Sequence, residues 1–301
     1  MNKQNKLCIL INTKDRPTEL ALLMQSLRTQ TFQEFDIFIM DDVSGTMPNN
    51  YHFFNCLITR TRLEGHKIFL KRNGFPHGVS RARQAIVDWA MEKGDYDYFL
   101  RVDDDVVLEK DYIERLFKVI DSGYDIASGV TVPMTGPPII RNPDYLNGIA
   151  NRVILDEDGE YIMNGDDCGY DYTKSVIIPA HHFRSCAIMT RELHGKVKYY
   201  PTRLSMHGFR EEQIFSYRAL MEGFKIGVDT KAVNYHQLTP SGGERFPNQQ
   251  DLTRFNQKIL EEFTVEHKEE LNKIFTHDNM PSELELQKEN NLLMKKKEVK
   301  K

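Results

Sequence analysis

Asp103, Asp104 and Asp105 follow directly after a short apolar run that begins at Tyr96. The run is too short for a helix and predicts a buried strand. Alternate side chains of a strand share a face, so we expect Asp103 and Asp105 to point together and Asp104 to point away. Carboxylates this close repel one another unless a cation lies among them, and Mg2+ or Mn2+ holding a diphosphate would supply it. The alternative is an acidic turn that water solvates.

Two further sites carry acidic side chains. Asp42 follows a predicted strand over Phe35–Met40, which places its carboxylate where open α/β sheets bind ligands. Glu211 and Glu212 open a predicted helix that runs to about Glu222. Adjacent helix residues are rotated by ~100°, so we do not expect both glutamates to face one hydroxyl. One of them could act as a general base; alternatively, both are first-turn acids that complement the helix dipole.

Cationic side chains occur at two places that matter for ligand binding. Arg81 and Arg83 lie in the first turn of a helix that is predicted to begin at Ser80. Positive charge is unfavourable there unless an anion lies nearby, so the pattern indicates either an anion site or pairing with surface carboxylates. His236 ends the last predicted strand, over Ile226–Tyr235, where a histidine is either structural or a ligand.

The first part of the chain alternates between strand and helix patterns. A strand over Lys6–Asn12 leads to Thr13 and Arg16, and Pro17 suits the first turn of the next helix. The alternation continues through the first ~120 residues and predicts a mostly parallel sheet flanked by helices. The glycine fingerprint of dinucleotide-binding folds is missing after the first strand, which argues against a nicotinamide cofactor.

The pattern changes after Tyr124. Two apolar runs, 153–155 and 161–163, flank an Asp-Glu-Asp-Gly turn and predict a hairpin, and further strands are expected at 175–178 and 184–189. From Pro247 onward, apolar residues at helical spacing predict a helical appendage that packs on the domain or on a second subunit. We therefore divide the chain into two halves of one domain, residues 1–105 and 106–240, and an extension over 241–301.

Composition excludes several classes of protein. The 301 residues carry 40 Lys and Arg against 44 Asp and Glu, a formal net charge of −4, which gives no general attraction to nucleic acid or anionic membranes. Four scattered cysteines argue against a zinc site or a disulfide framework and suit a reducing compartment. No apolar run approaches the ~20 residues that cross a bilayer, and no signal peptide is apparent. We expect a cytoplasmic protein without a transmembrane segment.

Taken in order, six segments resemble the motifs of family 2 glycosyltransferases of GT-A fold. The resemblance covers about residues 5–237, and the segments are Lys6–Arg16, Phe35–Ser44, Asn73–Arg83, Tyr98–Asp105, Phe209–Arg218 and His236. It implies an α/β fold of GT-A type. In that fold a nucleotide-binding α/β/α sandwich surrounds a mostly parallel central sheet, here with a helical C-terminal appendage.

The resemblance also implies roles for individual residues. Thr13 and Arg16 would line the nucleotide pocket, Asp42 would accept a hydrogen bond from the base, and Arg81 and Arg83 would lie close to nucleotide and phosphates. In the DXD motif, Asp103 and Asp104 would hold ribose and sugar, while Asp105 and His236 would bind Mn2+ or Mg2+. Glu212 would be the catalytic base, with Glu211 binding the acceptor or supporting the loop. Lys14-Asp15 and Gln84 depart from the commoner family pattern.

The expected activity is metal-dependent transfer of a sugar, a hexose by expectation, from a nucleotide-sugar donor, with inversion at the anomeric carbon. The donor would be a UDP-sugar, the acceptor a glycan, protein, lipid or modified base, and the C-terminal helices could form a homo-oligomer. A sugar nucleotidyltransferase is an alternative, although the first loop lacks the glycines that it would need. A non-catalytic nucleotide- or carbohydrate-binding protein is the other alternative, against which Asp105, Glu212 and His236 together argue.

Overall fold

The computed structural model describes residues 6–135, 153–155, 161–163, 175–199, 203–239, 242–243 and 247–275. Its main feature is a nine-stranded sheet in the order β3-β2-β1-β4-β10-β6-β11-β5, with β9 also paired to β11. A separate two-stranded sheet joins β7 (Val153–Leu155) to β8 (Tyr161–Met163) in antiparallel register, which confirms the predicted hairpin.

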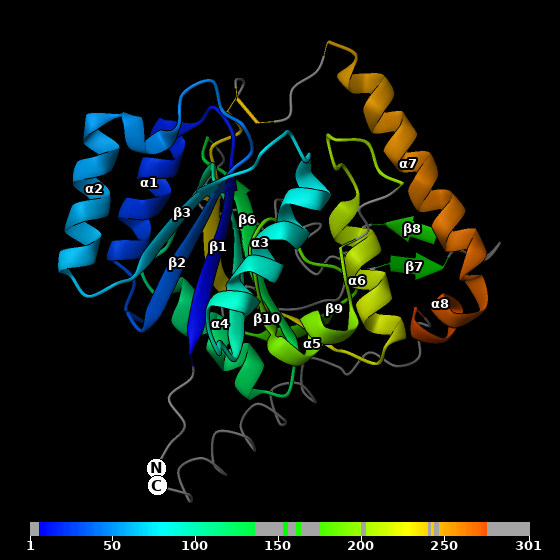
Figure 1. The fold of residues 1–301 in the computed structure, drawn as a ribbon. Helices are drawn as coiled ribbons and strands as arrows, with labels where there is room; N and C mark the ends of the chain where they lie inside the picture. Colours follow the sequence, from blue (N-terminus) through cyan, green and yellow to red (C-terminus); the bar gives the residue numbers. More distant parts are fainter. Residues whose placement is uncertain are drawn as a thin grey trace, which may run out of the picture.

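The N-terminal half of the sheet is parallel. It contains β1 (Leu7–Thr13), β2 (Phe35–Asp41), β3 (Ile68–Arg72) and β4 (Tyr98–Asp103). These strands are apolar almost throughout because helices cover both of their faces. All their carboxyl ends therefore lie at one edge of the sheet, as Figure 1 shows.

The C-terminal half of the sheet is mixed. β10 (Ala187–Thr190) runs antiparallel to both β4 and β6 (Ile126–Pro133), whereas β6 and β11 (Ile226–His236) are parallel. β5 (Val106–Leu108) and β9 (Ile177–Ala180) pair with β11 in antiparallel register. Since β4 pairs directly with β10, the two halves of the chain share one sheet.

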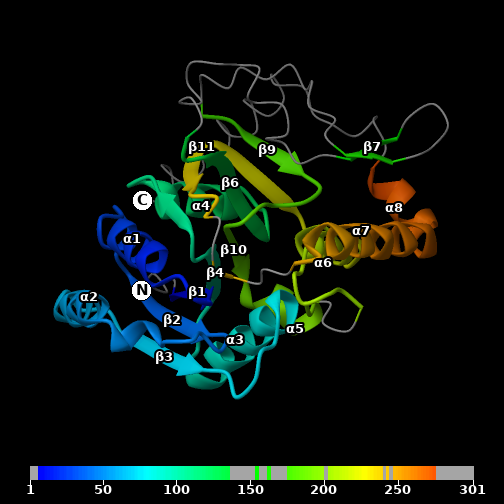
Figure 2. The same ribbon diagram turned by 90° about the horizontal axis from the view of Figure 1, so that it is seen from above.

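Two helical layers enclose the sheet (Figures 1 and 2). Side chains of α1 (Pro17–Arg28), α2 (His52–Leu63) and α4 (Tyr112–Asp121) pack in the core on one face. Side chains of α3 (Val79–Lys93), α5 (Arg191–Lys196) and α6 (Glu211–Met221) pack in the core on the other. This arrangement confirms the predicted α/β fold, a mostly parallel sheet between helical layers.

The C-terminal extension packs on the domain within the same chain. α7 (Gln249–Glu266) and α8 (Lys268–Ile274) bury Ile259, Phe263 and Leu271 against Ile214 and Tyr217 of α6. Figure 2 shows α7 lying alongside α6 at the edge of the molecule. Residues after 275, including the Lys-rich end of the chain, lie outside the described residues.

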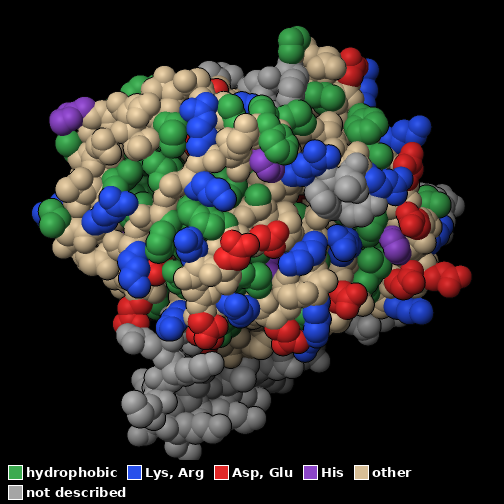
Figure 3. Space-filling view, in the orientation of Figure 1, with side chains coloured by type: hydrophobic (Ala, Val, Ile, Leu, Met, Phe, Trp, Pro, Cys, Tyr) green, Lys and Arg blue, Asp and Glu red, His purple; other side chains and the backbone are tan. Residues whose placement is uncertain are grey.

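The outer surface agrees with the near balance of charge in the sequence. Charged side chains of both signs are interspersed over the face drawn in Figure 3. In the part of the chain that the structure describes, no helix combines the length and apolar character needed to span a bilayer. The expected cytoplasmic location stays a prediction.

Candidate active site

A cavity of about 280 Å³ opens at the carboxyl edge of the parallel strands. Its lining comes from the ends of β1, β2, β4 and β11, from the start of α3 and from the loop before α6. The lining residues are Asn12, Thr13, Lys14, Arg16, Asp42, Gly78, Val79, Ala82, Arg83, Val102, Asp103, Asp104, Asp105, His207, His236 and Gly243. Most of the residues predicted from the sequence to bind the donor therefore face one cavity.

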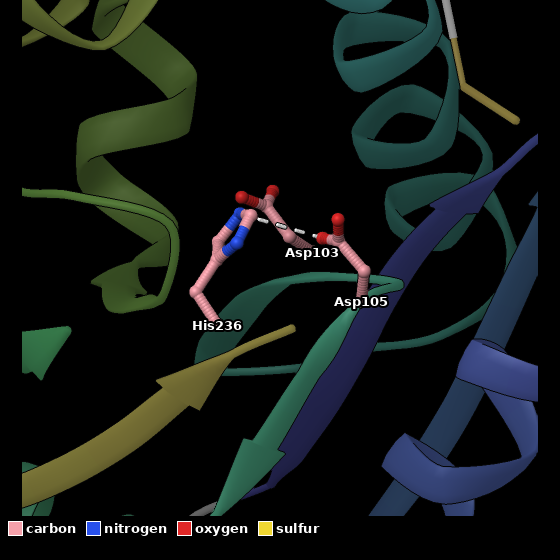
Figure 4. Close-up of side chains that lie close together, drawn as sticks. All are labelled: Asp103, Asp105 and His236. Atoms are coloured by element: carbon pink, nitrogen blue, oxygen red, sulfur yellow. Dashed lines mark ion pairs between the residues drawn. The ribbon is translucent and has the colours of Figure 1, made fainter. Parts of the chain in front are cut away.

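Asp103, Asp105 and His236 form a cluster in this cavity (Figure 4). Each offers one ligand atom, and these atoms lie within 4.8 Å of one another. The short strand β5 brings the distant histidine to the aspartates, because Val106 pairs with His236 across β5 and β11. The backbone N–H of Gln237 also donates to the carbonyl of Asp105 at 2.8 Å. As the strand alternation predicted, Asp103 and Asp105 point together.

The cluster suits a divalent cation. Nε2 of His236 lies 3.5 Å from Oδ1 of Asp105, while its Nδ1 accepts the N–H of Leu238 at 3.0 Å. Arg16 pairs with the other oxygen, Oδ2, of Asp105 at 2.9 Å. At Asp103, Arg83 pairs with Oδ1 at 2.8 Å, and no arginine pair with Oδ2 is found among the described residues. Each carboxylate thus keeps one oxygen outside its arginine pair, and two carboxylates with one imidazole are ligands that Mn2+ accepts.

Electrostatics keep Asp103 ionised. Burial alone would raise the pKa of its carboxyl, but the charges of Arg83 and Arg101 outweigh burial and lower this pKa to about 2. For Asp105, burial raises the pKa, although His236 and Arg16 oppose the shift. A carboxylate that is already deprotonated at neutral pH needs no proton release to bind a metal.

Asp104 points away from the cluster, as predicted. Its Oδ2 accepts the hydroxyl of Thr13 at 2.8 Å, and its Oδ1 accepts Nη1 of Arg16 at 2.9 Å. Burial raises the pKa of Asp104 to about 6. These bonds fix the loop between β1 and α1 against the end of β4. The predicted contacts of Asp104 and Asp103 with ribose and sugar stay predictions.

Asp42 organises the loop after β3. Its carboxylate accepts Nδ2 of Asn73 at 2.6 Å, the backbone N–H of His77 at 2.9 Å and that of Gly78 at 3.0 Å. Asp42 is only 4% exposed, yet it lines the cavity beside Gly78. The predicted contact with a nucleotide base would therefore be added to a carboxylate that already holds the loop in place.

Arg101 is a functional candidate that the sequence analysis missed. It lies on β4, two residues before Asp103, and is 4% exposed. Its Nη2 atom lies 2.7 Å from Oε1 of Glu211 and 2.6 Å from Oε1 of Glu212. A lone arginine within an apolar strand, on the same face as Asp103, was the signal that could have revealed it.

The two glutamates differ in exposure. The side chain of Glu211 is 4% exposed and also pairs with Nε of Arg83 at 2.8 Å, and burial raises its pKa. The side chain of Glu212 is 25% exposed. The expectation that only one of them faces the acceptor hydroxyl stays a prediction, although both carboxylates reach one nitrogen of Arg101. Their long side chains span the separation of the backbone positions.

Three predicted residues lie outside the cavity at the carboxyl edge of the strands. Glu211 and Glu212 do not line it and connect to it through Arg83 and Arg101. Arg81 is exposed and lines a smaller hollow beside Ser205 and Met206. Arg83 is paired with Asp103 and Glu211, so its predicted contact with phosphates would compete with two carboxylates.

The strand order and the cavity place the chain in the GT-A fold class. Residues 8–138 match the model of the family described as glycosyl transferase family 2. The chain thus carries a glycosyl transferase family 2 domain, which confirms the predicted family and agrees with the predicted class of enzyme. A search of curated proteins finds no match.

Several solved structures share the fold at low sequence identity. GalNAc-T7 with UDP, GalNAc and Mn2+ is 15% identical, with a TM-score of 0.62 over 85% of this chain and 48% of that one. S. aureus TarS 1–349 in complex with UDP-GlcNAc is 17% identical, with a TM-score of 0.55 over 86% of this chain and 66% of that one. TarS 1–349 alone is 18% identical, with a TM-score of 0.50 over 77% and 60%. The chain therefore spans roughly half to two thirds of these proteins.

Proposed function

We propose that this chain is a metal-dependent glycosyltransferase that moves a sugar from a UDP-sugar to an acceptor hydroxyl with inversion. The observation that carries the proposal is the convergence of Asp103, Asp105 and His236 in one cavity at the carboxyl edge of the sheet. Two structures of similar fold add support, since one contains UDP, GalNAc and Mn2+ and the other UDP-GlcNAc.

The donor side of the reaction uses the cavity. Asp105 and His236 would hold Mn2+ or Mg2+ together with Asp103, and the metal would stabilise negative charge on the leaving diphosphate. Asp103 joins the proposed ligand set because its ligand atom lies with the other two, a role beyond the sugar contact expected from the sequence. Thr13, Arg16 and Asp42 would line the nucleotide part of the cavity.

The acceptor side of the reaction uses Glu212. Its Oε1 accepts the N–H of Ser185 at 3.1 Å and Nη2 of Arg101, so Oε2 is the atom that would take the acceptor proton. The acceptor oxygen would bond to the anomeric carbon as the bond from that carbon to the diphosphate breaks. Attack opposite the leaving group inverts the configuration. Glu211 is too buried to act as this base and would instead support the site.

The test is titration of the purified chain with UDP and with GDP, with and without Mn2+, followed by assay of UDP release from a panel of UDP-sugars. We expect tight binding of UDP only with metal, and UDP release from at least one UDP-sugar. Formation of pyrophosphate from UTP and a sugar phosphate would instead indicate a nucleotidyltransferase. Metal-dependent UDP binding without any turnover would indicate a binding protein, and stronger binding of GDP would contradict the uridine assignment.

A further inference from the structure

Arg101 occupies an unusual place for a charged side chain. It lies in the middle of the nine-stranded sheet, on β4, and pairs with Ala187 of β10. Both neighbouring strands are apolar, and the arginine side chain is 4% exposed. Burying a guanidinium is costly unless carboxylates and hydrogen bonds compensate for lost water.

The compensation is concentrated on one atom. Nη2 of Arg101 lies 2.7 Å from Glu211 and 2.6 Å from Glu212, whereas Nε and Nη1 are buried without a hydrogen-bond partner among the described residues. The guanidinium carbon lies 5.2 Å from the ring centre of Phe183 and 5.9 Å from that of Tyr199. Cation–π contacts offset part of the cost. The two donors without partners, Nε and Nη1, nevertheless reduce what the ion pairs of Arg101 with Glu211 and Glu212 can contribute to stability. This points to a role of Arg101 in the site.

The ion pairs form a continuous chain from the metal cluster to Glu212. Asp103 pairs with Arg83 at 2.8 Å, and Arg83 pairs with Glu211 at 2.8 Å. Glu211 in turn pairs with Arg101, whose Nη2 also binds Glu212. The five side chains come from β4, α3 and α6, and Arg101 is the last link before the base. A shift of Arg101 would therefore change the placement of Glu212 relative to Asp103.

We propose that Arg101 is the positioning residue for the base: its Nη2 holds Oε1 of Glu212 and leaves Oε2 for the acceptor, while Glu211 ties Arg101 to Arg83. This inference rests on the proposed function. Arg101 itself touches neither donor nor acceptor in this scheme. It acts by restricting Glu212 to one rotamer, and the N–H of Ser185 supports the same oxygen.

The test compares Arg101→Met, Glu211→Gln and the double variant with the wild-type chain. Arg101→Met removes one of the two arginines that compensate the carboxylates of Asp103, Glu211 and Glu212. We therefore expect a lower melting temperature. Glu211→Gln in the same molecule removes one of those charges and should restore much of the melting temperature. The rate of UDP release from a UDP-sugar in Mn2+, with water as acceptor, measures the contribution of the base. UDP titration measures the affinity of the donor site. Arg115→Met on α4, which breaks an ion pair with the buried Asp229 of β11, is the matched control.

The expected pattern separates positioning from stability. Arg101→Met should lower kcat by about 100-fold or more, while KM for the donor and UDP affinity change by less than about threefold. The double variant should regain melting temperature but not kcat. Arg101→Lys, which keeps the charge on a differently shaped group, should fold and lose at least about tenfold in kcat. Arg115→Met should lower the melting temperature with kcat unchanged.

Three results would overturn the inference. They are wild-type kcat in Arg101→Met, recovery of kcat together with melting temperature in the double variant, and wild-type kcat in Arg101→Lys. If Arg101→Met does not fold, the double variant and Arg101→Lys still decide the question. A wild-type chain that binds UDP with metal yet releases none from any donor would overturn the proposed function and this inference together, whereas an active wild type with unchanged variants would overturn this inference alone.

Discussion

Gly78 packs directly against Met206: a Cβ atom on Gly78 would lie 2.7 Å from the Cα atom of Met206. The N–H of Val79 donates to the carbonyl of Met206 at 3.0 Å across the same contact. Gly78 also has φ of +72°, a conformation that favours glycine. The loop that Asp42 binds, Asn73–Gly78, therefore packs in direct contact with the loop at Met206 that precedes Glu211 and Glu212.

This contact gives a first prediction. Gly78→Ala should destabilise the fold by about 1–3 kcal/mol, because both backbone strain and a clash oppose a side chain there. It should also weaken UDP binding, since Gly78 lines the cavity. Thermal unfolding and UDP titration are the measurements. Gly74→Ala, in the same loop with nothing within 4 Å of the added atom, is the control and should behave like wild type.

The second prediction concerns the metal cluster. Asp105→Asn and His236→Gln should each abolish the metal dependence of UDP binding while leaving the melting temperature within a few degrees of wild type. Asp95→Asn, at an aspartate whose side chain is 88% exposed, should retain the metal dependence. UDP titration in Mn2+ and in chelator distinguishes these cases. UDP release that continues at full rate in chelator would contradict the assignment.

Much of the candidate site could be predicted from the sequence, because the strand pattern and the order of the motifs determine which side chains share a face. Strand alternation predicted the shared face of Asp103 and Asp105, and a chain of motifs predicted that His236 belongs with them. Arg101 stood out in the sequence only as a lone arginine in an apolar strand, and its partners on α6 are brought to it by tertiary packing. β6 was missed because Gly129 interrupts its apolar pattern. The structure gives the reason for that glycine, since the carbonyl of Ala232 occupies the place of a side chain.

The third prediction separates the two glutamates. Glu212→Gln keeps the shape and the bond from the N–H of Ser185, but it removes the basic carboxylate. Release of UDP should therefore slow by about 100-fold or more, with UDP affinity unchanged. Glu211→Gln should cost less than about tenfold in rate, because Arg101 still holds Glu212. Steady-state kinetics on both variants provides the measurement, and the reverse order of effects would exchange their roles.

The fourth prediction concerns the C-terminal helices. Asn256 of α7 is fully buried, and its Oδ1 accepts the N–H of Ser205 at 2.8 Å, while Gln257 accepts Nε of Arg210 at 2.8 Å. α7 thus holds the loop that precedes the glutamates. Truncation after about residue 246 should expose Ile214 and Tyr217, promote self-association and abolish UDP release. Gel filtration and the UDP assay test this, and a truncated monomer with full activity would contradict it.

A milder variant isolates the polar contact from the apolar one. Asn256→Leu removes the acceptor for Ser205 but keeps the helix, so it should lower stability by about 1–3 kcal/mol and slow UDP release. Phe255→Ser changes the neighbouring residue, which is 48% exposed, and is the control that should leave both properties unchanged.

The last prediction concerns acid stability and His194. This histidine of α5 is 2% exposed and lies among the rings of Phe99, Tyr199 and Phe215. Burial lowers its pKa from 6.5 to about 3. The folded state therefore resists protonation that the unfolded state accepts below pH 6.5. The contribution to stability is complete above pH 6.5 and is lost as the pH falls toward 3.

The slope of stability against pH measures this effect. One proton taken up on unfolding corresponds to about 1.4 kcal/mol per pH unit. His194→Leu removes that proton, so the free energy of unfolding should fall less steeply with decreasing pH between 6.5 and 3, by about that amount per unit. Denaturant unfolding at a series of pH values in this window gives the slopes. Because the comparison uses slopes, a uniform loss of stability from altered packing does not affect it, and identical slopes in the two proteins would show that His194 is protonated in the folded state.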